Sequence, residues 1–191
     1  MNGRDIYQAM RSLRTFHEQV ALLLQTADAM MAEAGHDVHR SCQSTAVAYY
    51  SYVVDKAPQW TPEFAFRWYA VPADEHVAAF ISVILCPRDP VPGVPPFEEP
   101  LVSCGVGRFD LGVPYGNKLY HRARAILWTN VDRDGTWGLH QPALGKEGPM
   151  RIDLMAVPLV QVTSTQDLRE RVISPLLARV QTATNQADPT S

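Results

Sequence analysis

Apolar residues recur every three or four positions from Asp5 to Gly35, and no proline interrupts them. This spacing is the period of a helix that buries one stripe along its length. It predicts a helix over residues 5–34, ended by Gly35 in the left-handed conformation. At ~1.5 Å per residue the helix is roughly 45 Å long, about as long as a compact chain of 191 residues is wide. The stripe has two seams: the first seam contains Met10, His17, Leu24 and Met31, and the second seam contains Ile6, Leu13, Val20, Ala27 and Ala34.

A further row of residues, called here the flank, widens the stripe: Ala9, Phe16, Leu23 and Met30. A stripe of this width is typical of a helix that packs in a bundle or against a domain, rather than of a two-stranded zipper. Because a sheet with strands of ~5–10 residues spans about 20–30 Å, at least one end of the helix is expected to project beyond it. We therefore predict a homo-oligomer or a protein partner, bound through Leu13, Val20, Leu24 and Met31.

The middle of the chain carries strand patterns. Residues 63–71 alternate between two faces, which indicates a half-buried strand, whereas residues 77–86 are apolar on both faces and indicate a central strand. Further strands are predicted at 101–109, 119–131, 136–140 and 150–162, the last broken at Pro158. Residues 44–55 fit either a helix or a strand, and a short helix is the favoured interpretation.

A capping-box sequence at 164–167 opens a predicted C-terminal helix, kinked at Pro175. The connections between strands are too short for crossover helices, so the sheet is expected to be mostly antiparallel. The predicted fold class is α+β: a mostly antiparallel sheet of about five to six strands, packed by the long N-terminal helix and the C-terminal helix in a two-layer sandwich. Residues 1–181 are expected to form one domain, and residues 182–191 a flexible tail.

Composition excludes several classes of protein. A net charge of −3 gives no strong field to attract nucleic acid. No apolar run approaches the ~20 residues that span a bilayer, and the first residues lack the apolar core of a signal peptide. The cysteines Cys42, Cys86 and Cys104 are odd in number and widely spaced, which argues against a disulfide framework. We expect a cytoplasmic protein that binds neither membrane nor nucleic acid.

His36, His39 and Cys42 follow the predicted helix at intervals of three, a spacing that metal sites use. A closed zinc site needs a fourth ligand, and the sequence offers no second close pair of ligands. The favoured interpretation is a polar loop whose histidines cap the C-terminus of the helix, without a metal. No cofactor is predicted.

Two glycine patterns have structural interpretations. Gly105 and Gly107 lack the strand–turn–helix context of a dinucleotide fingerprint, and they indicate a bulged or twisted strand. Residues 130–135 resemble the start of a calcium loop, but strand patterns flank them. The Asp134 and Gly135 pair therefore predicts a hairpin turn.

The candidates for chemistry lie on two predicted strands: His121, Arg122 and Arg124 on one, and Asp153 on the other. If these strands are neighbours, the arginines and the aspartate can form an ion-pair ladder across an open face of the sheet. The functional interpretation is a hydrolase or nuclease. A solvated, salt-paired face is favoured, because catalysis on carboxylates needs a partner group in a contrasting environment.

Residues 87–100 contain six prolines, which predicts a stiff, extended loop. Phe97 is the one large aromatic side chain of this segment. It is a candidate for docking onto a partner, although pinning the loop to its own domain is the favoured role.

The sequence contains no catalytic motif of high specificity, so whether the protein is an enzyme stays open. The leading hypothesis is a non-catalytic interaction, regulatory or accessory protein that self-associates or binds a partner through its N-terminal helix. One alternative is a small-molecule sensor with a pocket between sheet and helices, lined by Tyr49, Tyr50, Trp60 and Trp68. The other is the hydrolase or nuclease described above.

Overall fold

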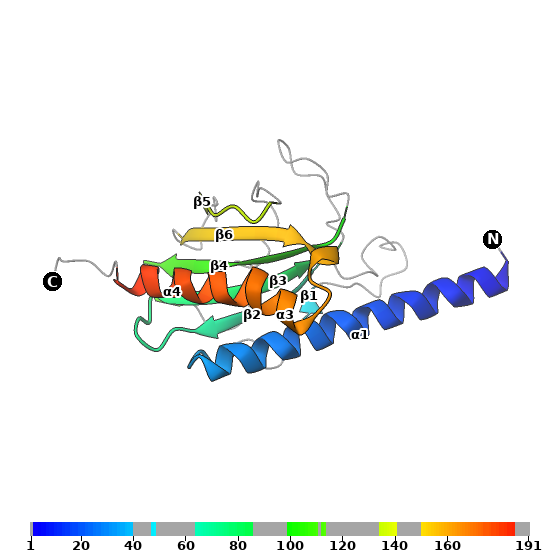
Figure 1. Cartoon of the computed structure of the whole chain (residues 1–191), viewed down its shortest axis with the longest axis horizontal. Helices are drawn as coiled ribbons and strands as arrows, with labels where there is room; N and C mark the ends of the chain where they lie inside the picture. The colour runs from blue at the N-terminus through cyan, green and yellow to red at the C-terminus, as the bar shows by residue number, and fades with distance from the viewer. Residues whose placement is uncertain are drawn as a thin grey trace.

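The computed structural model describes residues 2–39, 47–48, 64–85, 99–110, 112–113, 134–140 and 150–185. Within these residues one antiparallel sheet is packed by a long N-terminal helix and a C-terminal helix (Figure 1). The predicted α+β fold class is therefore confirmed. The strand predicted at 119–131 lies outside the described residues.

Helix α1 (Gly3–Glu33) confirms the predicted N-terminal helix. It begins two residues earlier than predicted because Asn2 and Asp5 form a capping box, in which each side chain accepts a hydrogen bond from the backbone N–H of the other, at 3.0 and 3.1 Å. Its last helical residue is Glu33, and Gly35, whose φ is +86°, lets the His36 N–H donate to a carbonyl of the last turn. The His36 side chain does not cap this end as predicted, because its Nδ1 contacts the Ala70 carbonyl oxygen instead.

The sheet is built from β1 (Val47–Ala48), β2 (Phe64–Ala70), β3 (Val77–Ile84), β4 (Leu101–Phe109), β5 (Gly138–His140) and β6 (Met150–Pro158). These strands lie in the order β1-β2-β3-β4-β6-β5, and each neighbouring pair is antiparallel. Strand β3 lies inside the sheet with every side chain buried, as its two apolar faces predict. Within 44–55, where a short helix is the favoured prediction, the described residues Val47 and Ala48 form the strand β1 instead, because they pair with β2.

The chain leaves β6 at Pro158, as predicted, and enters the short 3-10 helix η4 (Leu159–Gln161). A continuous helix follows, made of α3 (Thr165–Leu168), the π-helical turn η5 (Arg169–Ile173) and α4 (Ser174–Asn185). The Ser164 hydroxyl caps it by accepting from the Asp167 N–H at 3.0 Å, and its bond to the Asp167 side chain lowers the pKa of that carboxyl.

A proline disturbs this C-terminal helix where the sequence predicts a kink. Pro175 has no N–H to donate to the preceding turn, and the helix widens into the π turn η5 just before it. Helix α4 then continues to Asn185, so residues 182–185 of the predicted tail are helical, and residues 186–191 lie outside the described residues. The Thr182 and Thr184 hydroxyls donate to carbonyls of the preceding turn, and these bonds lie in the last turns of the helix.

Both long helices pack on the same face of the sheet (Figure 1). The core between them contains apolar residues of α1, of β2 to β4, of β6 and of the C-terminal helix. Its largest helical members are Leu24, Met30, Met31, Leu168, Ile173 and Leu176. Each such side chain contributes about 1.5–3 kcal/mol when it is fully buried, so this face supplies much of the stability of the fold.

The opposite face of the sheet is aromatic and is also buried. Its cluster contains Phe64, Phe66, Trp68, Phe80 and Phe109, with Trp68 in ring contact with Phe80 and Phe109 at centroid distances of 5.0 and 5.8 Å. The prediction of a half-buried strand at 63–71 is wrong in this respect, because β2 is buried on both faces. The alternation itself is confirmed: Phe64, Phe66 and Trp68 lie on the aromatic face, and Tyr69 lies on the face that the helices cover.

Two glycines of β4 make room for these rings. Gly105 faces Phe80 across the β3–β4 pair, and a Cβ atom at Gly105 would lie 2.7 Å from the Phe80 ring and 2.4 Å from the carbonyl oxygen of Asp153. At Gly107 the nearest contact would be 3.2 Å, to the ring of Phe109. The pairing of β4 runs without interruption on both sides, so these glycines serve packing and no bulge is present.

We expect Gly105→Ala to lower the free energy of unfolding by about 2–3 kcal/mol or more, because backbone and ring would both have to move. Gly107→Ala is the matched control on the same strand. Its neighbours are the edges of aromatic rings that must shift only slightly, so its loss is expected to be clearly smaller. Urea titration of both variants measures the difference, and equal losses would show that the Phe80–Gly105 contact is not the tight one.

Candidate functional site

Helix α1 has a buried half and an exposed half. Residues Val20, Leu24, Ala27, Met30 and Met31 are buried, whereas every residue at positions 2–15 is exposed. Figure 1 shows the N-terminal half of α1 extending well beyond the sheet. Residues 3–15 are called the arm from here on. A projecting end, expected from the length of the seams, is therefore present.

The arm carries the same apolar stripe as the buried half. Ile6 and Leu13 of the second seam are 47% and 37% exposed, Met10 of the first seam is 61% exposed, and Tyr7 beside them is 68% exposed. Seams that bury Val20 and Leu24 in the core thus run on into water. A row of large apolar side chains on a projecting element is the kind of surface that marks an interaction site.

Two hollows lie along this stripe. The first, of about 540 Å³, is lined by Met10, Leu13, Arg14 and His17, with Glu18 and Ala21 beside them. Positions i, i+3, i+4 and i+7 of a helix form the hole that receives a side chain of a facing helix. The second hollow, of about 390 Å³, lies at the base of the arm, and its apolar lining includes Phe16, Val20, Leu23, Leu159, Val162 and Leu168.

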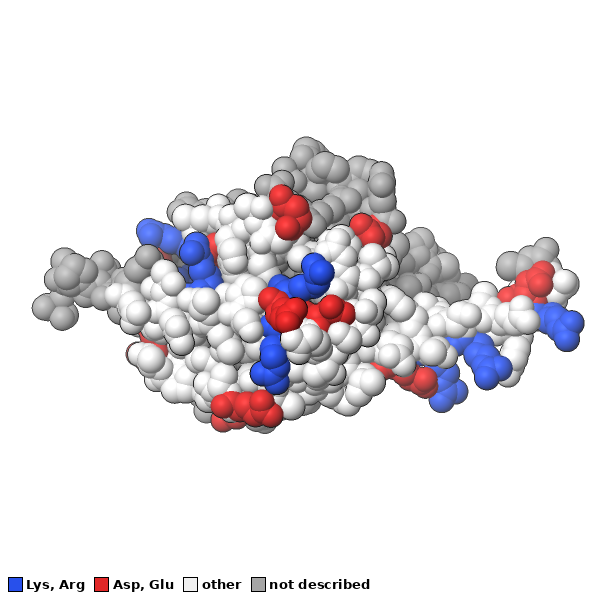
Figure 2. Space-filling model, viewed as in Figure 1, with Lys and Arg blue, Asp and Glu red and all other residues white. Residues whose placement is uncertain are grey.

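Charged side chains border the apolar stripe on the arm. Arg4, Arg11 and Arg14 lie on the arm together with Asp5, and Glu18 follows one turn after Arg14. Figure 2 shows basic and acidic side chains interspersed along the projecting end of α1. Arg14 and Glu18 form an exposed ion pair at 3.2 Å, one turn apart. An exposed pair of this kind contributes only a few tenths of a kcal/mol, so both side chains are free to find other partners.

The predicted binding residues fall into different places. Leu13 lies on the arm, whereas Val20, Leu24 and Met31 are buried in the chain's own core. Those three contact the sheet side of the molecule and are not part of the exposed surface. Phe97 lies outside the described residues.

The candidate metal ligands do not assemble in the described part of the chain. The Nδ1 atom of His36 contacts the carbonyl oxygen of Ala70 at 3.2 Å, and the backbone N–H of His39 donates to the carbonyl of Trp68. Both histidines thus belong to an extended segment that runs along the end of β2. Cys42 lies outside the described residues, and within them no three His, Cys, Asp or Glu side chains converge on one point.

Among the catalytic candidates, only Asp153 is described. It forms an ion pair with Arg179 of α4, which contacts the same carboxylate oxygen through two nitrogens. The Arg179 guanidinium also lies over the ring of Trp137, 5.4 Å from its centroid. Asp153 therefore fastens the C-terminal helix to β6. His121, Arg122 and Arg124 lie outside the described residues.

A half-buried polar cluster that the sequence does not predict joins α1 to β2. The Asp28 carboxylate accepts from the Nε of Arg67 and from the hydroxyl of Tyr69, both at 3.0 Å. Asp28 lies beside the seams, and Arg67 and Tyr69 share the face of β2 that meets the helix. The strand alternation does place Arg67 and Tyr69 together, but their partner lies about forty positions earlier in the chain, at 39 and 41 residues' separation.

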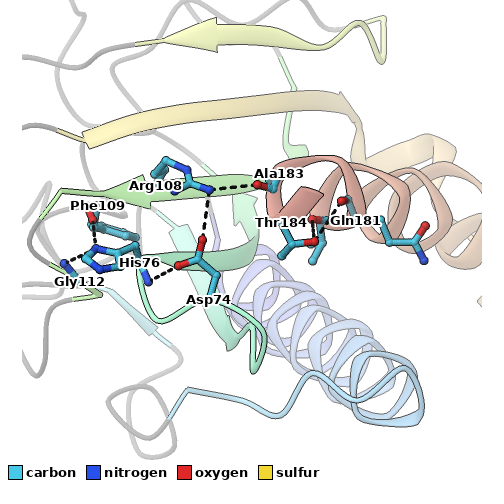
Figure 3. Close-up of polar contacts among 9 residues, drawn as sticks. Asp74, His76, Arg108, Phe109, Gly112, Gln181, Ala183 and Thr184 are labelled. Atoms are coloured by element: carbon cyan, nitrogen blue, oxygen red, sulfur yellow. Dashed lines mark hydrogen bonds and ion pairs between the residues drawn. The ribbon is translucent and has the colours of Figure 1, made fainter. Parts of the chain in front are cut away.

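A second missed cluster lies at the turn between β2 and β3 (Figure 3). Arg108 of β4 donates to the Asp74 carboxylate at 3.1 Å and to the carbonyl of Ala183 at 3.0 Å, which places its positive charge at the C-terminal end of α4. His76 lies beside it, with Nδ1 3.0 Å from the Phe109 carbonyl oxygen and 3.1 Å from the Gly112 nitrogen. These contacts connect the hairpin, β4 and the last helix, and they give the cluster a structural role.

Cys104 is the one described cysteine, and it is buried on the helix-covered face of β4. Burial raises the pKa of its thiol. The sulfur lies 3.8 Å from the carbonyl oxygen of Val172, under the C-terminal helix. A thiol in such surroundings is not a nucleophile, because the thiolate is the reactive form.

We expect Asp28→Ala to lower the free energy of unfolding by roughly 2–4 kcal/mol, because it removes the carboxylate that accepts from the Arg67 guanidinium and from the Tyr69 hydroxyl. Arg14→Ala removes the exposed ion pair of the same helix and is expected to cost only a few tenths of a kcal/mol. Urea unfolding of both variants makes the comparison. A loss for Asp28→Ala as small as that of the control would mean that the cluster does not fasten α1.

A reactivity measurement tests the burial of Cys104. In a variant in which Cys42 and Cys86 are replaced by serine, we expect the remaining thiol to react with an aromatic disulfide reagent at pH 8 far more slowly in the folded than in the unfolded protein. Burial both raises the thiol pKa and blocks access. Equal rates in buffer and in guanidinium chloride would contradict the position under the C-terminal helix.

Comparisons with protein-family models, curated proteins and solved structures found no match for this chain. No helix among the described residues is both long and apolar enough to cross a membrane. Within the described part of the chain, the polar clusters have structural partners and the metal-ligand candidates stay apart. The arm of α1 is the surface whose side chains the fold leaves unexplained, and it is the candidate functional site.

Proposed function

We propose that this protein is a non-catalytic interaction protein that uses the arm of α1 to dock against another helix. The observation that carries the proposal is the continuity of the seams. One half of α1 buries them in the protein's own core, and the arm presents the same positions to water with Ile6, Met10 and Leu13 exposed. A helix with an apolar stripe normally buries it against another element.

The energetics favour docking. Each large apolar side chain of the arm gains up to about 1.5–3 kcal/mol when it is transferred fully from water to an apolar contact. Helices shorter than ~12–15 residues are marginal in water, so the arm depends on the buried half and on the Asn2–Asp5 capping box for its helicity. A partner helix would therefore stabilise the arm as well as bury its stripe.

The alternative functions find less support. A sensor pocket lined by Trp68 is disfavoured because its ring is fully buried between Phe80 and Phe109. A hydrolase centred on Asp153 is disfavoured because its carboxylate is neutralised by Arg179. A cytoplasmic location is part of the proposal, and the buried thiol of Cys104, which has no disulfide partner, is in keeping with a reducing compartment.

Paired substitutions on the two faces of the arm test the proposal. Ile6→Glu combined with Met10→Glu places two charges on the seams, and Gln8→Glu combined with Thr15→Glu places two charges on the opposite, solvent face. Wild type and both variants are tagged and purified from cells that also express an untagged copy of the chain, and recovered proteins are quantified by mass spectrometry. We expect at least one protein, this chain included, to be recovered about tenfold less with the seam variant alone, since tenfold corresponds to ~1.4 kcal/mol.

Circular dichroism and thermal unfolding serve as controls for folding of both variants. The substitutions lie on exposed positions, so the melting temperature is expected to stay close to that of the wild type. If no protein distinguishes the seam variant from the solvent-face variant, the arm is not a docking element and the proposal is wrong.

A further inference from the structure

We infer that the helix that docks on the arm is the arm of a second copy of this chain, packed antiparallel about a two-fold axis, with Met10 facing the partner's Leu13 and Ile6 facing the partner's His17. This inference rests on the proposed function and specifies its partner. A two-fold axis makes every contact occur twice, so a single short stripe yields a continuous interface. The register follows from the side chains that the arm presents.

The seams are complementary in this register. Reversing one helix brings first-seam residues opposite second-seam residues, as in antiparallel helix bundles. The partner's Met10 then enters the hollow of about 540 Å³ between Met10, Leu13, Arg14 and His17. The seams face each other from Ile6 to His17 of each arm, and the pairing ends there because the next seam residue, Val20, is buried in its own core.

The flank pairs small residues with large ones. Ala9 faces the partner's Phe16, and Asn2 comes alongside the partner's Leu23. Phe16 and Leu23 line the hollow of about 390 Å³ at the base of the arm, so the small side chain of Ala9 meets the edge of this hollow on the other copy. Alternation of small and large side chains at facing positions is what lets two helices pack closely.

Charges on the opposite edge agree with the same register. Tyr7 comes beside the partner's Arg14, whose guanidinium can lie over the phenol ring. Arg4 comes level with the partner's Glu18, which places opposite charges on one edge of the interface. Arg11 comes level with the partner's Arg11, but both point to solvent, where repulsion is weak and screened by salt.

A parallel pair fits poorly. Equal seam positions would face each other, so His17 would face the partner's His17. Both cores begin to cover the seams at Val20 and would meet at that end of the pair. In the antiparallel pair the two cores lie at opposite ends, and only the exposed parts of the two sets of seams face each other.

Mixed cysteine cross-linking tests the register. All samples carry serine in place of Cys42 and Cys86. One preparation carries Ile6→Cys and the other His17→Cys, and each is oxidised alone and after mixing. A disulfide needs Cα atoms within ~7 Å, which the antiparallel register allows only between the two preparations, so we expect at least about tenfold more covalent dimer in the mixture. Gln8→Cys mixed with Thr15→Cys is the matched control, because these positions are level with each other on the outer faces.

Each result of this experiment either supports or overturns the inference. Covalent dimer in the mixture, with none from the outer-face control, supports the inference. Dimer within each preparation alone indicates a parallel pair and overturns it, although docking through the arm would stand. No dimer from seam cysteines, with a monomer mass by light scattering for the reduced wild type, also overturns it. The proposed function is then tested separately, by whether the variant with Ile6→Glu and Met10→Glu loses a different partner.

Should the reduced His17→Cys preparation alone prove monomeric where the wild type is dimeric, Met10→Cys mixed with Leu13→Cys replaces the pair. These two positions face each other nearest the two-fold axis. Failure of this second pair to cross-link under conditions in which the wild type is dimeric overturns the register.

Discussion

The mismatch in length between α1 and the sheet governs this structure. The helix has 31 residues and is about 46 Å long, whereas the longest strands have nine residues and span about 30 Å. A stripe that runs the whole length of such a helix cannot be buried by one sheet. The core takes the stripe from Val20 onward, and the remainder becomes the arm. The exposed seams and the hollow at the base of the arm both follow from this mismatch.

The sheet is a firm support for so long a helix because buried side chains pack on both of its faces. Strand β3 is buried on both faces, with the helices on one face and the aromatic cluster on the other. Gly105 keeps the aromatic side close-packed by leaving space for Phe80. The buried half of α1 packs against β2, α3 and η5, and β2 pairs with β3 over its whole length, so the direction of the arm is fixed by the fold.

Charged residues of the sheet act as fasteners between elements. Asp28 and Arg67 join α1 to β2, Asp153 and Arg179 join β6 to α4, and Asp74 and Arg108 join the first hairpin to β4. Pairing is the condition under which charges tolerate burial, and each pair spans two elements distant in sequence. The described carboxylates of the sheet are thus used in holding the fold together, and the exposed apolar arm is left as the surface for binding.

The sequence by itself determined what depends on short-range periodicity. The seams predict α1, the Gly35 cap ends it, the alternation assigns the faces of β2 and β3, and Ser164 opens the C-terminal helix. Only the tertiary structure decided where along the seams burial stops, that both faces of β2 are covered, and which base meets which acid, as in the Asp28–Arg67 pair. Periodicity shows that a face is apolar, but the contact that buries it comes from residues far away in the chain, whose distance in space no local pattern encodes.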